Sequence, residues 1–111
     1  MFRMFQKKKS QEPLFIYRIE DTFAMKSGDC VVTGQVVQGS AGVNDTVWYM
    51  DARGTRQFCV VISGIEYGRE GMKKTAKVNP SGTYGSHYGI LIKGYPMEMF
   101  EIGGTLQAGN C

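Results

Sequence analysis

The stretch SGDCVVTGQVVQG, residues 27–39, decides how the fold is read. Its valines predict a β-strand, yet Thr33-Gly34 stands in the middle, where a glycine leaves no side chain to pack. Residues on a strand alternate between two faces, so Cys30, Val32, Gly34 and Val36 share one apolar face. A small residue on the inner face of a curved strand makes room where a barrel narrows. We therefore expect Gly34 to serve the curvature of a sheet, in preference to the close approach of a ligand.

The same strand pattern recurs along the chain. Short apolar runs are separated by turn signals, and 15 of the 111 residues are glycine. Several short strands at regular spacing predict an all-β sandwich or barrel. A helical turn is expected only near residues 96–100. The expected strands are 14–25 (one strand, or two broken near Glu20-Asp21), 30–37, 45–50, 56–67, 88–94 and 105–108.

The length of 111 residues is that of one ordinary domain. The chain is 42% hydrophobic and carries 13 basic and 10 acidic residues, a net charge of +3, which does not by itself indicate a nucleic-acid binder. We expect a basic N-terminal tail at 1–12, a single β-barrel domain at 13–108 and a C-terminal tail at 109–111. No apolar run is long enough to cross a membrane, so no membrane partner is expected.

The cysteines, Cys30, Cys59 and Cys111, are odd in number and widely spaced. This pattern is typical of neither a disulfide framework nor a zinc site. The chain has a single histidine, so no metal site is expected. Buried, reduced cysteines in a cytoplasmic protein are the expectation.

Several motifs, in order, resemble domain 2 of elongation factor Tu and of related translational GTPases. They are IEDTFAM (19–25), VVTGQVVQG (31–39), VNDTV (43–47), SGIE (63–66), GSHYGILIKG (85–94) and FEIGGTL (100–106). The resemblance implies an all-β fold, a closed six-stranded antiparallel β-barrel. It also implies turns at Asn44, Gly94 and Gly103, and places His87 where the factor has an asparagine in its pocket for the aminoacyl end of tRNA.

The GTPase domain of that family is absent from this chain. No Gly-x-x-x-x-Gly-Lys-Ser/Thr loop occurs, so no nucleotide cofactor is expected. Ser86 and His87 are neighbours and point to opposite faces of a strand, which is poor geometry for a nucleophile and its base. We therefore predict a non-enzymatic protein without catalytic residues or cofactors, with His87 at the surface or at the rim of a pocket.

Basic residues indicate a candidate contact surface for RNA. The segment after Glu66 is rich in glycine and lysine, which predicts an exposed loop. Its tyrosines are suited to stacking on bases, and its cations, with those of the tail, to binding phosphates. The candidate contact residues are Lys7, Lys8, Lys9, Tyr67, Arg69, Lys73, Lys74, Lys77, Tyr84 and His87.

Two function classes remain open, and we expect the first. The first is a translation-factor-like binding module that contacts RNA, the ribosome or a translation protein. The second is a structural or interaction scaffold without a nucleic-acid role. Strand 56–66 favours the second, because its residues 58–62 are apolar on both faces. Its outer face must then be covered by the chain's own tail or by a second copy in an oligomer.

Overall fold

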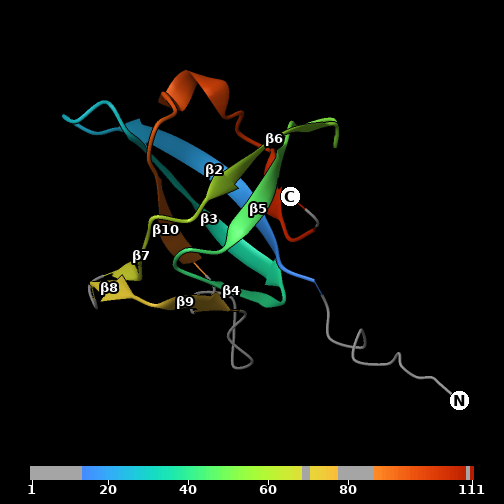
Figure 1. Ribbon diagram of the computed structural model, residues 1–111, viewed down its shortest axis with the longest axis horizontal. Coiled ribbons are helices and arrows are strands. Elements are labelled where there is room, and N and C mark those ends of the chain that lie inside the picture. Colours follow the sequence, from blue (N-terminus) through green and yellow to red (C-terminus); the bar gives the residue numbers. More distant parts are fainter. Residues whose placement is uncertain (1–13, 69–70, 78–86, 110) are drawn as a thin grey trace, which may run out of the picture.

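A computed structural model describes residues 14–68, 71–77, 87–109 and 111 (Figure 1). The chain forms an eight-stranded sheet in the order β6-β5-β11-β2-β3-β10-β7-β8, and every paired strand is antiparallel to its neighbour. The strands of this sheet are β2 (Ile16–Ala24), β3 (Cys30–Gln38), β5 (Thr46–Met50), β6 (Arg56–Val61), β7 (Gly64–Glu66), β8 (Met72–Lys73), β10 (His87–Ile92) and β11 (Thr105–Gln107). The all-β prediction is confirmed.

Two small elements complete the fold. β4 (Ser40–Gly42) pairs with β9 (Thr75–Lys77) in a separate two-stranded ribbon. The 3-10 turn η4 (Met97–Met99) confirms the helical turn expected near residues 96–100. In Figure 1, η4 lies at the upper end of the molecule, and β7, β8 and the ribbon lie at the lower end.

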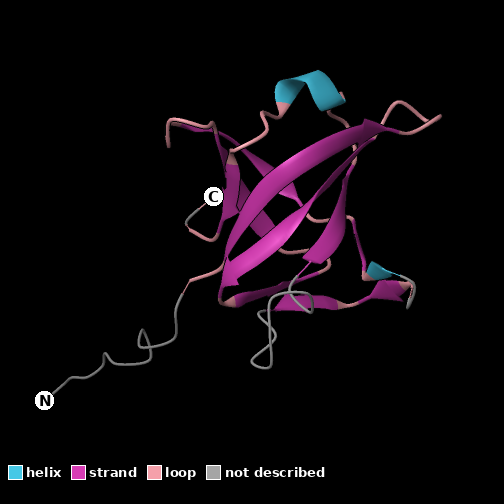
Figure 2. Cartoon of the chain, turned by 180° about the vertical axis from the view of Figure 1, so that it is seen from behind, coloured by secondary structure: helices cyan, strands magenta, loops and turns pink. Residues whose placement is uncertain are grey.

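The prediction of a closed six-stranded barrel is wrong. The long strands β2 and β3 curl across the back of the molecule (Figure 2), so the sheet forms a half-barrel. Among the described residues, its end strands β6 and β8 each pair on one side only and not with each other. Closure needs hydrogen bonds between the first and last strands of the sheet. Here β8 has only two residues and pairs with β7, while β9 leaves the sheet to pair with β4.

The region predicted as one or two strands over 14–25 forms one strand, β2, and the suspected break near Glu20-Asp21 is a β-bulge. Ile19 pairs with Gly34 and Asp21 with Thr33, so Glu20 is the extra residue. A bulge bends its strand and increases the local twist. The bend brings the backbone of β2 against Gly34, where a Cβ atom would overlap the carbonyl oxygen of Arg18. Gly34 thus serves the curvature of the sheet, as expected, and the backbone that approaches it is the chain's own.

The core lies inside the curl of the sheet. Cys30, Val32, Gly34 and Val36 are buried on β3, which confirms the predicted inner face. Tyr17 is fully buried, and its single hydroxyl hydrogen is shared between the carbonyl oxygens of Tyr88 (2.5 Å) and Val32 (3.2 Å). Burial raises the pKa of this phenol far above its ordinary value. The Tyr17 side chain therefore links three strands, β2, β3 and β10, as a neutral donor.

Replacing Tyr17 by phenylalanine is expected to lower the free energy of unfolding by about 1–2 kcal/mol, because two buried carbonyl groups lose a donor. The measurement is a urea unfolding curve. Tyr95→Phe is the matched control: the Tyr95 hydroxyl is only partly buried, its bond to the Cys59 carbonyl is longer, at 3.4 Å, and a smaller change is expected. An equal midpoint for Tyr17→Phe and the parent chain would contradict the role of the hydroxyl.

The expectation of three reduced cysteines is wrong for two of them. Cys59 and Cys111 form a disulfide, with their Cα atoms 6.0 Å apart, whereas Cys30 is free and buried as expected. Wide spacing in the sequence argued against a disulfide, but β11 brings the end of the chain back to the β5–β6 side of the sheet. Because disulfides are rare in reducing compartments, the cysteines no longer support the expected cytoplasmic location, which stays a prediction.

One predicted turn is confirmed, and two predicted segments differ from the structure. Asn44 has a positive φ of 79°, which confirms its predicted turn position. The single strand expected over 56–67 is divided into β6 and β7 at Ile62 and Ser63. The amide of Ile62 donates to the carbonyl of Asp45, just before β5, whereas that of Ser63 donates to the carbonyl of Leu91 in β10. The ribbon strand β4 lies between the expected strands 30–37 and 45–50, where no strand was expected.

Candidate functional site

Of the lysines predicted to contact RNA, the structure describes three, and two of these lie on short strands where a loop was expected. Lys73 ends β8, Lys77 ends β9, and Lys74 lies between them; all three are exposed. Within β9, Ala76 is fully buried between the exposed Thr75 and Lys77. The burial of Ala76 and the pairing of β9 with β4 give this part of the segment a strand conformation, which its glycine and lysine content did not indicate.

Other predicted contact residues cannot be placed against these lysines. Lys7, Lys8, Lys9, Arg69 and Tyr84 lie outside the described residues. The single surface expected from the tail and the segment after Glu66 therefore stays a prediction.

Tyr67 is half-buried and packs against another aromatic ring. Its ring centroid lies 4.8 Å from that of Tyr88, at an interplanar angle of 36°. Its amide donates to the carbonyl of Gly71, which closes the turn before β8. Tyr67 therefore contributes to packing between this turn and β10, and part of its surface is already in contact with protein.

His87 lies at the rim of a hollow, as expected, but in acidic surroundings. Its Nε2 atom is 3.5 Å from Oε1 of Glu20, and the other oxygen of Glu20 is 3.9 Å from Arg18. The hollow has a volume of about 350 Å³ and is also lined by Glu66, Gly34 and Gly89. Two carboxylates on one hollow oppose the binding of phosphate, so this part of the surface is distinct in charge from the lysines of β8 and β9.

Sequence reasoning missed this acidic hollow because Glu20 and Glu66 are remote in the chain. The register joins them: Asp21 pairs with Thr33, Thr33 with Gly89, and Gly89 with Glu66. The bulge in β2 then places Glu20 beside these paired residues. Strand parity could indicate the exposed face of each residue, but only the pairing of β10 with β3 and β7 brings the carboxylates to one place.

A smaller apolar hollow adjoins the acidic one and shares Glu66 and Gly89 with it. It has a volume of about 100 Å³ and is lined mainly by Met25, Val31, Met72 and Leu91. The exposed fraction of Met72 is 66%. These side chains lie on the outer face of the half-barrel, where β2, β3, β10 and β7 run side by side.

In residues 14–68, 71–77, 87–109 and 111, no three His, Cys, Asp or Glu side chains are placed to hold a metal ion. Burial raises the pKa of the Cys30 thiol, with a smaller contribution from Glu98. A buried thiol with a raised pKa is a poor nucleophile at neutral pH.

A third hollow, of about 350 Å³, lies beside η4, and two of its carboxylates, Asp51 and Glu101, have partners in the chain. The Asp51 carboxylate accepts hydrogen bonds from the amides of Arg53 and Thr55 and from the side chain of Gln57. These bonds, that from Thr55 foremost, lower the pKa of Asp51. Glu101 accepts a bond from the amide of Ala52. The two carboxylates thus fix the turn between β5 and β6.

No family model matches the chain. The resemblance to domain 2 of the translational GTPases consequently stays a prediction. No helix within the described ranges is long and apolar enough to cross a membrane.

Proposed function

We propose that this protein is a non-enzymatic, translation-factor-like binding module that contacts RNA phosphates through Lys73, Lys74 and Lys77. One observation carries the proposal. Three exposed lysines fall within five residues: Lys73 ends β8, which pairs with β7, Lys77 ends β9, which pairs with β4, and Lys74 lies between the two strands. Short strands hold the lysine backbones in place, so less conformational entropy is lost on binding than for a flexible tail.

The charge distribution supports a contact on the lysine side. The carboxylates of Glu20 and Glu66 lie on the hollow with His87, which we therefore leave out of the proposed phosphate contact. Exposed ammonium groups attract any polyanion, and the electrostatic part of this binding is independent of base sequence. The motifs shared with translation factors favour RNA, ribosomal RNA included, over other polyanions.

The triple variant Lys73→Ala/Lys74→Ala/Lys77→Ala is expected to bind RNA more weakly and with less dependence on salt. Each phosphate contact on a single strand contributes about 0.7 to the slope of log K against log salt, so the slope should fall by about 2. The measurement is the fluorescence anisotropy of a labelled single-stranded RNA over a series of salt concentrations.

A second triple variant is the matched control. Lys26→Ala/Arg53→Ala/Lys93→Ala removes the same net charge from exposed turns elsewhere in the fold. If both variants lose the same affinity and slope, net charge alone explains the binding. If the parent chain does not bind at low salt, the proposal is wrong.

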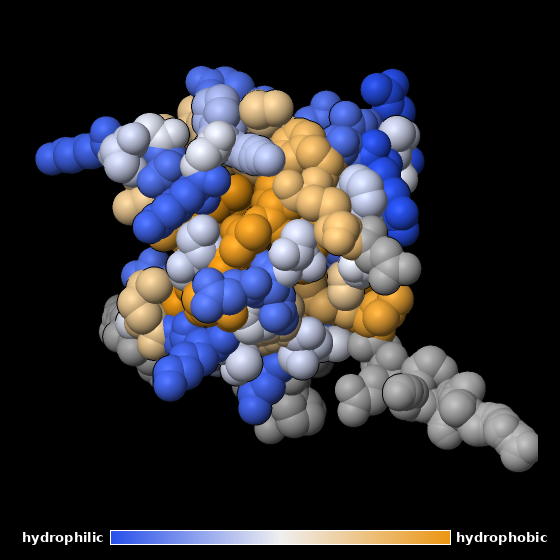
Figure 3. Space-filling model, viewed as in Figure 1, coloured by the Kyte–Doolittle hydropathy of each residue, from blue (hydrophilic) through white to orange (hydrophobic). Residues whose placement is uncertain are grey.

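The alternative function is a scaffold that associates with a second copy through β6. Among the described residues, β6 is an end strand of the sheet, and its Val61 side chain is 47% exposed. Figure 3, which has the same view as Figure 1, shows apolar side chains gathered over β5 and β6 in the middle of the molecule. Light scattering distinguishes the two functions: a stable dimer that binds no RNA would favour the scaffold.

A further inference from the structure

The end of the chain crosses the outer face of the sheet. β11 pairs with β5, and β5 pairs with β6, so β5 lies between the last strand and Cys59. After β11 the amide of Ala108 donates to the carbonyl of Phe15, and the chain then reaches Cys59 through Cys111. We name Ala108, Gly109 and Cys111 the C-terminal strap.

The strap lies against Trp48, the only tryptophan of the chain. Trp48 and Cys59 are directly paired across β5 and β6, and therefore lie on the same face of the sheet. A Cβ atom on Gly109 would lie 3.1 Å from Cδ1 of the indole. The guanidinium carbon of Arg56 lies 4.8 Å from the centroid of the indole ring. The indole is thus in contact with the strap and with a cation from β6.

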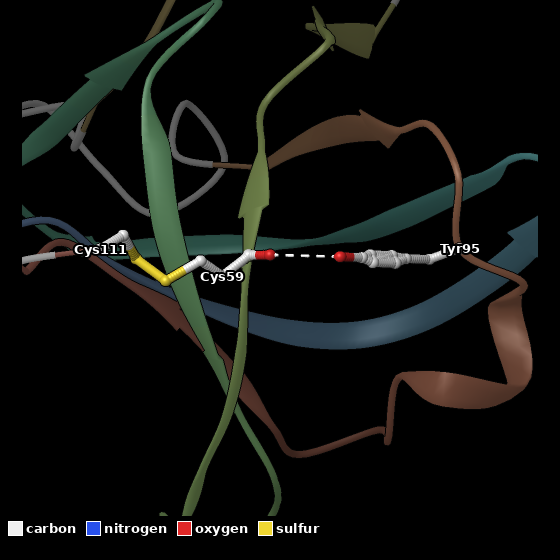
Figure 4. The surroundings of a disulfide bond; sticks show 3 residues. All are labelled: Cys59, Tyr95 and Cys111. Carbon is white, nitrogen blue, oxygen red and sulfur yellow. Dashed lines mark hydrogen bonds between the residues drawn. A yellow bond between two sulfur atoms is a disulfide. The ribbon is translucent and has the colours of Figure 1, made fainter.

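The disulfide fixes the strap at its end. Cys111 is exposed, whereas Cys59 is half-buried in β6. Figure 4 shows the Cys59 side chain directed toward Cys111, while its carbonyl oxygen is directed to the other side, toward the Tyr95 hydroxyl. The backbone of Cys59 is therefore fixed by two interactions that do not involve its sulfur. Its carbonyl accepts the hydrogen bond from the Tyr95 hydroxyl, and its strand pairs with β5 at Trp48.

We propose that the Cys59–Cys111 disulfide is a thiol-exchange site through which a dithiol reductant releases the C-terminal strap from Trp48. A thiolate of the reductant attacks the sulfur of Cys111, forms a mixed disulfide and displaces the Cys59 thiolate, which takes up a proton. The second thiol of the reductant then attacks the mixed disulfide and releases the Cys111 thiol. The reductant leaves as its internal disulfide, and the chain gains two electrons and two protons.

Release affects the strap more than the sheet, because Cys59 keeps its contacts within the fold. The strap has no strand pairing of its own after Gln107 in the described part of the chain. Besides the disulfide, the strap is held by the hydrogen bond from the Ala108 amide to the Phe15 carbonyl at its beginning. A terminal segment whose far end is tied by one link opens beyond that bond when the link is broken. The surface uncovered is that of Trp48 beside Arg56.

Tryptophan fluorescence tests the proposal on the intact protein. Acrylamide quenching is measured before and after treatment with dithiothreitol, with far-ultraviolet circular dichroism as a check of the sheet. The quencher is neutral, so the charge of Arg56 does not bias its approach. We expect the Stern–Volmer constant roughly to double on reduction, while the dichroism is unchanged, because one side of the indole loses its cover.

Two variants assign the response. Cys111→Ser removes the link and should give the higher quenching constant with or without reductant. Cys30→Ala, which alters only the free buried thiol, should respond to dithiothreitol as the parent does. Alkylation and mass spectrometry count the thiols, which should rise by two on reduction. The proposal is overturned if the disulfide resists dithiothreitol in the folded protein, or if both thiols appear without a change in quenching.

Discussion

Replacing Gly34 by alanine is expected to lower the free energy of unfolding by about 3 kcal/mol, the upper end of the usual range for overpacked sites. The added methyl group would overlap the carbonyl oxygen of Arg18. That atom is backbone in the neighbouring strand, so relief requires the β2 bulge to move away from β3. Urea unfolding monitored by circular dichroism measures the loss.

Gly89→Ala is the matched control for this prediction. Gly89 lies on the adjacent strand β10, opposite Thr33, and a Cβ atom there would meet Val31 at an ordinary contact distance of 3.6 Å. We expect a change within about 0.5 kcal/mol, as for a substitution that creates no clash. Equal stability of Gly34→Ala and Gly89→Ala would show that the approach of β2 to β3 does not require a glycine.

Removal of the disulfide is expected to lower the free energy of unfolding by about 2–4 kcal/mol, because the link closes a long loop in the unfolded chain. Cys59 and Cys111 are separated by 52 residues. The double variant Cys59→Ser/Cys111→Ser should therefore unfold at lower urea than the oxidised parent. The increase in the entropy of the unfolded chain, and not a loss of core contacts, is the main cause.

The reduced parent provides the control for side-chain effects of serine. Its unfolding midpoint should match that of the double variant, and Cys30→Ala should keep the full difference between oxidised and reduced protein. If the oxidised and reduced parent have the same midpoint, the disulfide does not stabilise the fold. The separate quenching measurement on Trp48 would still report whether the strap is released.

The proposed RNA contact and the strap lie on different parts of the fold. Lys73, Lys74 and Lys77 belong to the β8–β9 side, whereas Trp48 and Arg56 belong to β5 and β6 at the other end of the sheet order. The two proposals can therefore fail independently. An altered RNA affinity on reduction would indicate that the Trp48 surface also takes part in binding.

The sequence by itself determined the strand class and the faces of the strands. Alternation along residues 30–37 correctly placed Val32, Gly34 and Val36 inside. The turn at Asn44 was implied by the resemblance and agrees with the readiness of asparagine to adopt a positive φ. These features depend on the period of a strand and on the backbone preferences of single residues, so they are local. The need for a small residue at Gly34 was also readable from the stretch 27–39.

Only the tertiary structure decided which remote residues meet. In the structure, the backbone of Arg18 lies against Gly34, and Glu20 and Glu66 line the same hollow. Cys59 is bonded to Cys111. The tertiary structure also left the half-barrel open between β6 and β8 in the described residues. The reason is physical: alternation fixes which way a side chain points, but the partner of a strand depends on register and on hydrogen bonds across the whole chain.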